Sequence, residues 1–435
     1  MRAISCFLIA SAILLGGCDN ASLPPEAGYG PNPTLPPPKR EWPIPTVEVA
    51  KATGWAAGEK PTAAAGLKVE AFATGLKHPR WLYRLPNGDI LVAESGGPPD
   101  RPDNSRGIRR WVQGLLMRRA GASGENGNRI TLLRDSDADG KVELQTTFLD
   151  NLYSPFGMAM VDGTFYVGNS NAVMTYLYTD GATQLKGPGR KLLDLPAGTI
   201  NRHWAKNLIA NADGDKLYVA VGSNSNAAEF GMNHEEGRAA IWEVDRLSGK
   251  SRIFASGLRN PNGMDFSPAG ALWTAVNERD AIGGDLVPDY MTSVRDGGFY
   301  GWPYSYYGQI VDERVQPQRP DLVAKAIKPD YALGAHTASL GLTFARGNTL
   351  GPEYQSGVFI GQHGSWNRRP RHGYRVIYIP FNGETPAGMP REVLTGFLSP
   401  DGEARGRPVG VITDRTGALL VADDVGNVIW RVTRR

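Results

Sequence analysis

The sequence is poor in cysteine, with only Cys6 and Cys18 in 435 residues. Two cysteines cannot build a disulfide scaffold, a zinc ribbon or an iron–sulfur site. A Cys-x-x-Cys-His motif is absent, which excludes covalently attached haem. The net charge is also small, because 47 basic residues face 44 acidic ones. This balance gives no reason to expect nucleic acid as a partner.

Long hydrophobic runs are missing too. The longest apolar stretch, Phe7–Leu15, follows the basic Arg2 and is too short to span a bilayer. It ends in Leu15-Gly16-Gly17-Cys18, which resembles a bacterial lipobox. We therefore predict a lipoprotein signal peptide over residues 1–17 and lipidation of Cys18, with an ordinary signal peptide as the alternative. A periplasmic lipoprotein of the cell envelope, held to a membrane by its acyl chains, would follow.

Proline and glycine are abundant, with 32 and 54 residues. Prolines crowd the stretch Asp19–Pro45, and such a run favours extended polyproline geometry that cannot pack a core. Residues 18–65 are therefore predicted to be a semi-rigid tether that carries a globular domain over residues 66–435. In that domain, frequent glycine and proline favour many turns and short strands over long helices.

One pattern recurs six times in the globular part. Its clearest copy is Asn260-Pro261-Asn262-Gly263-Met264, followed by a turn at Gly270 and a second apolar strand. Apolar runs on both sides of a glycine turn signal a hairpin. The corresponding turn glycines are Gly88, Gly163, Gly214, Gly270, Gly357 and Gly417. Six copies predict an all-β, six-bladed β-propeller with long loop insertions, and a flat sandwich is the alternative.

A propeller gathers the loops that begin each repeat at one mouth of its central channel. These loops carry His203, Arg259, Asn260, Arg405 and Arg407. Guanidinium groups pair carboxylates bidentately, so this mouth predicts a polyanionic ligand. A histidine is the usual general base near neutral pH, and the alternative for His203 is a structural hydrogen bond between blades.

Several segments resemble one known family, in the same order along the chain. They are His203-Trp204-Ala205-Lys206-Asn207-Leu208, Leu258-Arg259-Asn260-Pro261-Asn262-Gly263, His363-Gly364-Ser365-Trp366-Asn367-Arg368, Gly406-Arg407-Pro408-Val409-Gly410 and Ala422-Asp423-Asp424-Val425-Gly426. Over nearly all of residues 66–435 the chain resembles the soluble pyrroloquinoline quinone (PQQ)-dependent sugar dehydrogenases, most closely their L-sorbosone dehydrogenase-like branch. The resemblance implies a six-bladed propeller with PQQ and a calcium ion at its mouth. It also implies oxidation of an aldose or related sugar aldehyde, with electrons passed to an external acceptor such as a quinone or a cytochrome.

The resemblance assigns roles to individual residues. His203 matches the base that takes the proton of the substrate hydroxyl, while Arg259 and Asn260 match the pair beside the cofactor and the reacting carbonyl. Arg405 and Arg407 match the two arginines on the quinone carboxylates. Arg202 stands where the family has an aspartate before the base, so the resemblance leaves the group that orients His203 unidentified. Arg368 is our candidate for the cation that replaces a family lysine.

Two calcium sites are expected. By resemblance, the main-chain carbonyls of Asp280 and Ala281 hold the cofactor calcium, and the alternative is a plain turn at Gly283-Gly284. Independently, Asp135, Asp137 and Asp139 alternate before Gly140, a spacing that lets a tight loop wrap one ion. Glu143 could complete this set, and the alternative is a polar hairpin turn.

An insertion over residues 106–120 places apolar residues at helical spacing between arginines. It predicts a helix packed over the propeller, or one that meets a membrane or an acceptor protein. Two other functions stay open at this point. One is a calcium-dependent propeller lactonase, and the other is a non-catalytic propeller that binds a glycan or a protein at the cell surface.

Overall fold

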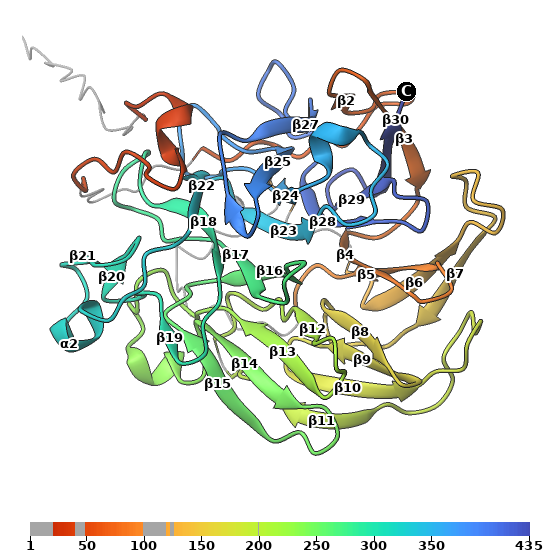
Figure 1. Ribbon diagram of the computed structural model, residues 1–435, viewed down its shortest axis with the longest axis horizontal. Coiled ribbons are helices and arrows are strands. Elements are labelled where there is room, and N and C mark those ends of the chain that lie inside the picture. The colour runs from red at the N-terminus through yellow and green to blue at the C-terminus, as the bar shows by residue number, and fades with distance from the viewer. Residues whose placement is uncertain (1–20, 40–47, 99–118, 122–125, 199) are drawn as a thin grey trace, which may run out of the picture.

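The computed structural model describes residues 21–39, 48–98, 119–121, 126–198 and 200–435. Its strands form six main antiparallel sheets arranged around one axis (Figure 1). The predicted six-bladed β-propeller is confirmed, and the flat sandwich is wrong. Figure 1 shows the inner strands β4, β16 and β28 near the centre and the outer strands β7, β11 and β15 at the periphery.

The first three blades follow chain order from the axis outward. The first contains β4 (Pro79–Arg84), β5 (Ile90–Glu94), β6 (Arg129–Arg134) and β7 (Leu144–Leu149). The second contains β8 (Met158–Val161), β9 (Thr164–Gly168), β10 (Ala172–Leu177) and β11 (Arg190–Asp194). The third contains β12 (Leu208–Ala210), β13 (Lys216–Val221), β14 (Ala240–Asp245) and β15 (Ser251–Ser256), and β19 (Gly298–Phe299) is added in parallel at its edge.

The next two blades carry additions from the N-terminal part of the chain. The fourth contains β16 (Pro261–Phe266), β17 (Leu272–Val276), β18 (Pro288–Ser293) and β22 (Tyr331–Ala335), extended by β1 (Tyr29–Gly30). The fifth contains β23 (Ser339–Phe344), β24 (Gly357–Gln362), β25 (Arg375–Asn382) and β27 (Arg391–Thr395), extended by β2 (Thr62–Ala63), with β26 (Thr385–Pro386) beside β25. The small pair β20 (Ser305–Tyr306) and β21 (Ile310–Val311) lies outside the blades. Helical segments are short: α2 (Pro320–Val323), η1 (Pro25–Gly28), η2 (Met232–Glu235) and η3 (Pro352–Tyr354).

The last blade closes the ring with strands from both ends of the domain. It contains β28 (Pro408–Thr413), β29 (Leu419–Asp423), β30 (Val428–Arg434) and, as its outer strand, β3 (Leu67–Ala73). Val69 lies opposite Val432 in this pair, and both side chains are buried. Opening the ring would therefore expose apolar surface and leave a strand unpaired. The pairing of β3 with β30 thus holds the six blades together.

Glycines let the inner strands approach one another at the axis. A methyl group on Gly157 would overlap the main chain at Asn207 and Leu208, and one on Gly341 would overlap the carbonyl of Val409. Gly263 and Gly410 are crowded in the same way by the next inner strand. The glycine that recurs after the polar start of the repeat is thus explained by close backbone contact around the channel.

The N-terminal region differs from the expected tether in its described parts. Tyr29 and Ala50 are buried, and β1 and β2 extend the sheets of two blades. Polyproline geometry does not exclude packing here, because single residues between the prolines supply hydrogen bonds and apolar side chains to an existing surface. Residues 21–39 and 48–65 therefore belong to the folded body. Within the described residues, no helix has both the length and the apolar character needed to cross a bilayer.

Candidate active site

His203 lies in the loop before β12, and its ring is oriented by main-chain and hydroxyl oxygens. Its Nδ1 atom is 2.7 Å from the carbonyl oxygen of Ser223 and 3.1 Å from the Ser223 Oγ. The hydroxyl itself donates to the carbonyl of Ser225, so both oxygens accept from the imidazole. Because a carbonyl can only accept, Nδ1 carries the proton and Nε2 keeps its lone pair. This is the protonation state that a general base requires.

Asn260 lies next to His203, and Arg259 precedes Asn260 in the chain. A Cβ on Gly222 would meet both the Asn260 amide and, at 2.6 Å, the Cβ of His203, so the two side chains flank the same point. The Arg259 guanidinium is 5% exposed and donates to the carbonyls of Asn226, Asn277 and Glu278. These contacts hold the Arg259 guanidinium in a fixed position.

A second group of cations comes from the first and last blades. The Arg80 guanidinium lies 5.7 Å from the ring centroid of Trp204, the residue after the base. It forms an ion pair with Asp424, which follows β29. Asp424 also accepts from His363 Nε2 at 2.9 Å, and His363 Nδ1 lies 3.5 Å from Arg407 Nη1. Segments far apart in the sequence therefore meet in one continuous cluster.

The charges in this cluster are set by burial and by mutual contact. Burial lowers the pKa of His363 to about 4, with Arg407 and Arg80 acting in the same direction, so this imidazole is neutral at physiological pH. Burial lowers the pKa of His78 as well. Burial raises the pKa of Asp424, but His363, His78 and Arg80 outweigh that effect and hold the pKa below its usual range. Arg80 thus pairs with Asp424 directly, while Arg407 is linked to it through the neutral His363.

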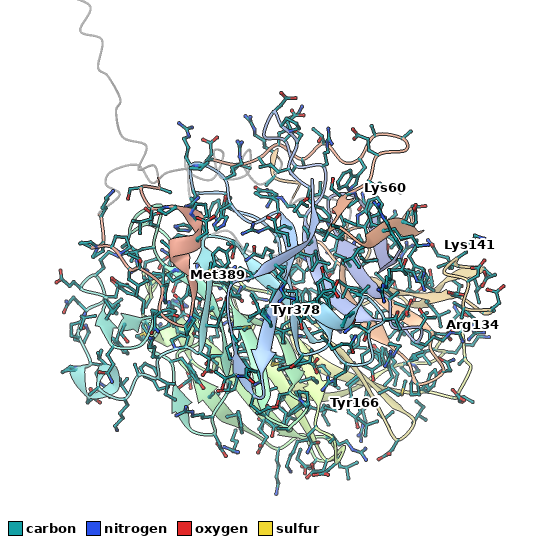
Figure 2. All side chains as sticks on the ribbon, turned by 45° about the horizontal axis from the view of Figure 1, so that its top comes forward. Lys60, Arg134, Lys141, Tyr166, Tyr378 and Met389 are labelled. Atoms are coloured by element: carbon teal, nitrogen blue, oxygen red, sulfur yellow. The ribbon has the colours of Figure 1, made fainter. Side chains whose placement is uncertain are left out.

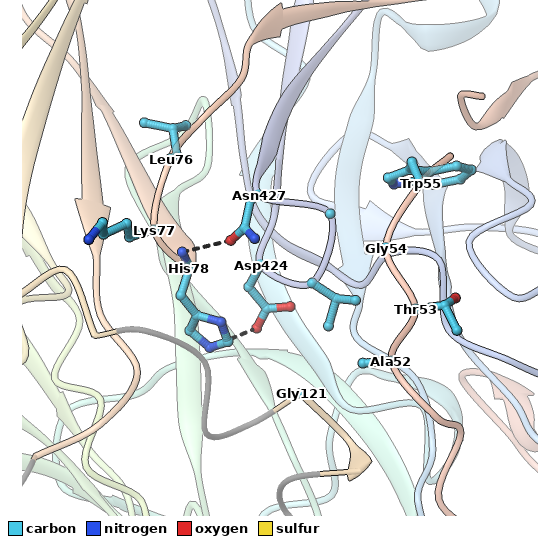
Figure 3. Close-up of a pocket in the computed structure, with 12 residues that line it drawn as sticks. Ala52, Thr53, Gly54, Trp55, Leu76, Lys77, His78, Gly121, Asp424 and Asn427 are labelled. Carbon is cyan, nitrogen blue, oxygen red and sulfur yellow. Dashed lines mark hydrogen bonds and ion pairs between the residues drawn. The ribbon is translucent and has the colours of Figure 1, made fainter. Parts of the chain in front are cut away.

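The cluster has unused hydrogen-bonding capacity. Arg80 Nε, Arg407 Nε and Asp424 Oδ1 are buried without a hydrogen-bond partner in the described part of the chain. Buried polar atoms are normally satisfied, so these atoms mark a place where a ligand belongs. Two unused guanidinium donors with excess positive charge fit the carboxylates of a quinone such as PQQ. His78 and Asp424 also line a cavity of about 460 Å³ beside Ala52–Trp55 (Figure 3).

Two expected cofactor ligands are engaged elsewhere. Arg405 is about one-third exposed and pairs with Glu59 at 3.3 Å. Arg368 is buried, and it donates to the carbonyl of Gly284 at 2.9 Å and lies 3.4 Å from the Asp285 carboxylate. The other guanidinium groups of the candidate site are those of Arg80, Arg259 and Arg407.

The expected cofactor calcium site is occupied by a side chain of the protein. The carbonyl of Ala281 accepts from Arg314 Nη1 at 2.9 Å, and that of Asp280 accepts from Asn226 Nδ2 at 2.9 Å. The Asp280 carboxylate pairs with His336 at 3.0 Å. Burial raises the pKa of this carboxyl, but His336 more than offsets it and brings the pKa to about 2. As these residues stand, the two carbonyls do not fit a calcium ion.

The acidic loop after β6 does bring its carboxylates together. One oxygen each of Asp135, Asp137, Asp139 and Glu143 lies within 4.8 Å of the others. Lys141 Nζ pairs with Asp139 at 2.9 Å. Figure 2 shows Arg134 and Lys141 at the outer edge of the molecule. Because the loop lies at this edge, a cation bound there would serve local stability.

Reasoning from the sequence missed four residues that shape the site. Ser223 acts through its main chain, which leaves no signature in the sequence. Asp424 lies in a segment that resembles the family, but no role was assigned to it. Arg314 lies in an insertion without periodicity. Arg80 could have been found, because it lies at the polar start of the first repeat, directly after His78-Pro79. Cys18 and the expected helix over residues 106–118 lie outside the described residues.

Comparison with known proteins places the chain in a family. A family model described as a domain of unknown function, DUF7133, matches residues 68–365. The chain belongs to this family. A second model, described as TrAA12-like, matches residues 321–435.

Individual relatives have low sequence identity to this chain, which belongs to the DUF7133 family. An uncharacterized protein of Borreliella burgdorferi is 32% identical over 241 residues, which are 55% of this chain and 62% of that protein. The pyrroloquinoline quinone-dependent pyranose dehydrogenase of Coprinopsis cinerea is 24% identical over 423 residues, covering 83% of this chain and 56% of that protein. The chain thus spans 56% to 62% of the length of these two relatives.

The solved structures repeat the same architecture. The holo form of the pyranose dehydrogenase PQQ domain from Coprinopsis cinerea superposes with a TM-score of 0.69 at 21% identity. The match covers 89% of this chain and 100% of that domain. At such low identity the similarity establishes the propeller fold.

Proposed function

We propose that the protein is a PQQ-dependent dehydrogenase that oxidises an aldose or a related, sorbosone-like sugar aldehyde. The observation that carries the proposal is the position of His203. Its Nδ1 is bound to the Ser223 carbonyl, and the Arg80 guanidinium of the first blade lies 5.7 Å from the ring centroid of Trp204, the next residue. The name of the Coprinopsis relative and its PQQ-containing domain support the same chemistry.

The chain's residues divide the chemistry among them. His203 Nε2 takes the proton of the substrate hydroxyl, and the Ser223 carbonyl stabilises the imidazolium that results. When bound, PQQ supplies the acceptor for the hydride and its two electrons. Arg80 and Arg407 bind carboxylates of the cofactor through donors that are otherwise unused. Arg259 stabilises negative charge that develops beside the base.

The remaining proposals concern partners and location. The electrons leave to an external acceptor, a quinone or a cytochrome, since the sequence has no haem-attachment motif. Cys18 carries the lipid anchor of a periplasmic lipoprotein, and the acyl chains supply its membrane affinity. Calcium binds the loop of Asp135, Asp137 and Asp139, whose carboxylates already converge.

Reconstitution tests the function. The purified chain is mixed with PQQ, cofactor binding is followed by absorbance and fluorescence, and dye reduction is measured with a panel of aldoses and sugar aldehydes. His203→Gln should lower turnover by about 100-fold to 10,000-fold, the usual contribution of a general base, while PQQ still binds. His234→Gln, on η2, is the matched control. Full turnover in His203→Gln would contradict the role of the base. Failure to bind PQQ at all would favour a non-catalytic propeller.

A further inference from the structure

The Arg314 guanidinium bridges two successive main-chain carbonyls. Its Nη1 lies 2.9 Å from the oxygen of Ala281, and its Nη2 lies 3.4 Å from the oxygen of Asp280. Ala281 has a positive φ of 70°, which is uncommon for a residue with a Cβ. This backbone conformation turns the two carbonyls toward one group, so the cradle is built into the chain.

Other donors complete the cradle. The Asp280 carbonyl also accepts from Asn226 Nδ2 at 2.9 Å and from Arg279 Nη2 at 3.3 Å. Arg279 is fully buried and is paired with Asp312, which also lies 3.6 Å from Arg314 Nε. Two guanidinium groups therefore share one carboxylate at this point, and one positive charge remains uncompensated by that carboxylate.

The cradle is connected to Arg259 through one side chain. The Asn226 Oδ1 accepts both from Arg259 Nη2 at 3.1 Å and from the main-chain N–H of Asp280 at 2.8 Å. The single amide of Asn226 thus fixes the positions of the cradle and of Arg259 relative to each other.

A calcium ion cannot share these carbonyls with Arg314. Calcium draws its oxygen ligands to about 2.3–2.6 Å and needs six or more of them. The guanidinium already uses the lone pairs that would point at the ion, and its charge would repel it. We infer that Arg314 is the resident cation of this cradle and makes cofactor binding independent of calcium.

This inference rests on the proposed PQQ-dependent function. It predicts that calcium changes PQQ affinity in the Arg314→Ala variant but not in the protein that has Arg314. The test uses the full chain with Asp137→Asn and Asp139→Asn, so that calcium binding to the acidic loop does not contribute to the measured heat. PQQ affinity is measured by cofactor fluorescence in EDTA and in millimolar calcium, and calcium binding is measured by calorimetry. With Arg314 present, PQQ affinity should be equal in both buffers and no calcium should bind.

Arg314→Ala should weaken PQQ binding in EDTA by about 10-fold to 100-fold, the loss expected for charge-assisted hydrogen bonds. Calcium should then restore most of the affinity and bind with one-to-one stoichiometry, because the freed carbonyls accept it. Arg319→Ala is the control, since Arg319 is exposed in the same segment and its side chain forms an ion pair with Asp321.

The outcomes separate the two hypotheses. If the protein with Arg314 binds PQQ only in calcium, or binds calcium at the cradle, the inference is wrong while the proposed function stands. If PQQ binds in neither buffer, the proposed function fails. Calorimetry then still decides the cradle's occupant, because only Arg314→Ala should take up calcium.

Discussion

The Nδ1 atom of His203 lies 2.7 Å from the carbonyl oxygen of Ser223, so a main-chain group holds the imidazole in place. Arg202, which precedes the base, points elsewhere: its guanidinium lies 4.6 Å from the ring centroid of Phe230. The backbone after β13 thus orients the His203 imidazole. A carbonyl fixes the tautomer without adding a full negative charge beside the base.

Gly222→Ala should disturb this arrangement without removing any functional group. The new methyl would overlap the Asn260 amide and the Cβ of His203, so both side chains must move. Misplacing a base by about 1 Å costs on the order of 100-fold in rate. We expect kcat to fall by that order while PQQ binding is retained, as measured by dye reduction and cofactor fluorescence.

Gly28→Ala is the control for this variant. Its methyl would make only ordinary contacts, at 3.4 Å from Gly334. Equal kcat in Gly222→Ala and in the wild-type protein would show that His203 does not depend on this packing.

Asp424→Asn should destabilise the protein without cofactor. Asp424 has a side chain that is 1% exposed and is the carboxylate partner of Arg80, so its loss leaves buried positive charge unpaired. Breaking a buried ion pair typically costs about 3–5 kcal/mol. Because a quinone carboxylate can replace the lost charge, PQQ should raise the Tm of the variant more than that of the wild-type protein.

The matched control for the Tm measurement is Asp414→Asn. Asp414 pairs with Arg431 at 2.9 Å and is also buried, but it follows the opposite end of β28. This variant should lose stability and show the wild-type shift with PQQ. A larger shift in both variants would mean that PQQ stabilises any weakened propeller.

The propeller could be predicted from the sequence because its physical causes are local. A glycine turn between two apolar strands, such as that at Gly270, makes a hairpin wherever it occurs. Close packing at the axis then requires glycine at equivalent points, such as Gly263 and Gly341. The packing of Tyr29 into the fourth blade was missed, because a two-residue strand has no periodicity.

The site was only partly predictable, since its decisive contacts join distant segments. His203, Arg259 and Arg407 could be named because each begins a repeat. Arg405 was named by the same rule, yet it pairs with Glu59 because the N-terminal segment covers that rim. The position of a residue in a repeat indicates its place at the mouth, but the partner of its side chain depends on insertions.

The buried histidines should make the protein sensitive to mild acid. His363 has a pKa of about 4 and His372 a pKa of about 3, both lowered mainly by burial. Between the unfolded pKa of about 6.5 and these folded values, the unfolded chain binds more protons, so the free energy of unfolding falls as pH falls. These shifts correspond to about 3 kcal/mol for His363 and about 5 kcal/mol for His372.

His363→Gln should flatten the pH dependence of stability. The variant retains a donor toward Asp424, and its free energy of unfolding should lose less than the wild type's as pH falls from about 6.5 to about 4. Urea unfolding at several pH values measures this. Identical pH profiles in the two proteins would show that His363 is protonated in the folded state.

Calcium should bind the acidic loop with modest affinity. Four carboxylates converge there, but the loop has Thr146 rather than a bidentate glutamate at its twelfth position, so we expect a Kd of about 10⁻⁴–10⁻³ M. Asp137→Asn with Asp139→Asn should abolish the heat of binding in calorimetry. Lys141→Met should strengthen binding, because it frees the Asp139 carboxylate from its 2.9 Å ion pair. Asp180→Asn, at an exposed residue, serves as the control. If the wild-type protein shows no heat of calcium binding, this loop is a polar hairpin turn without a metal.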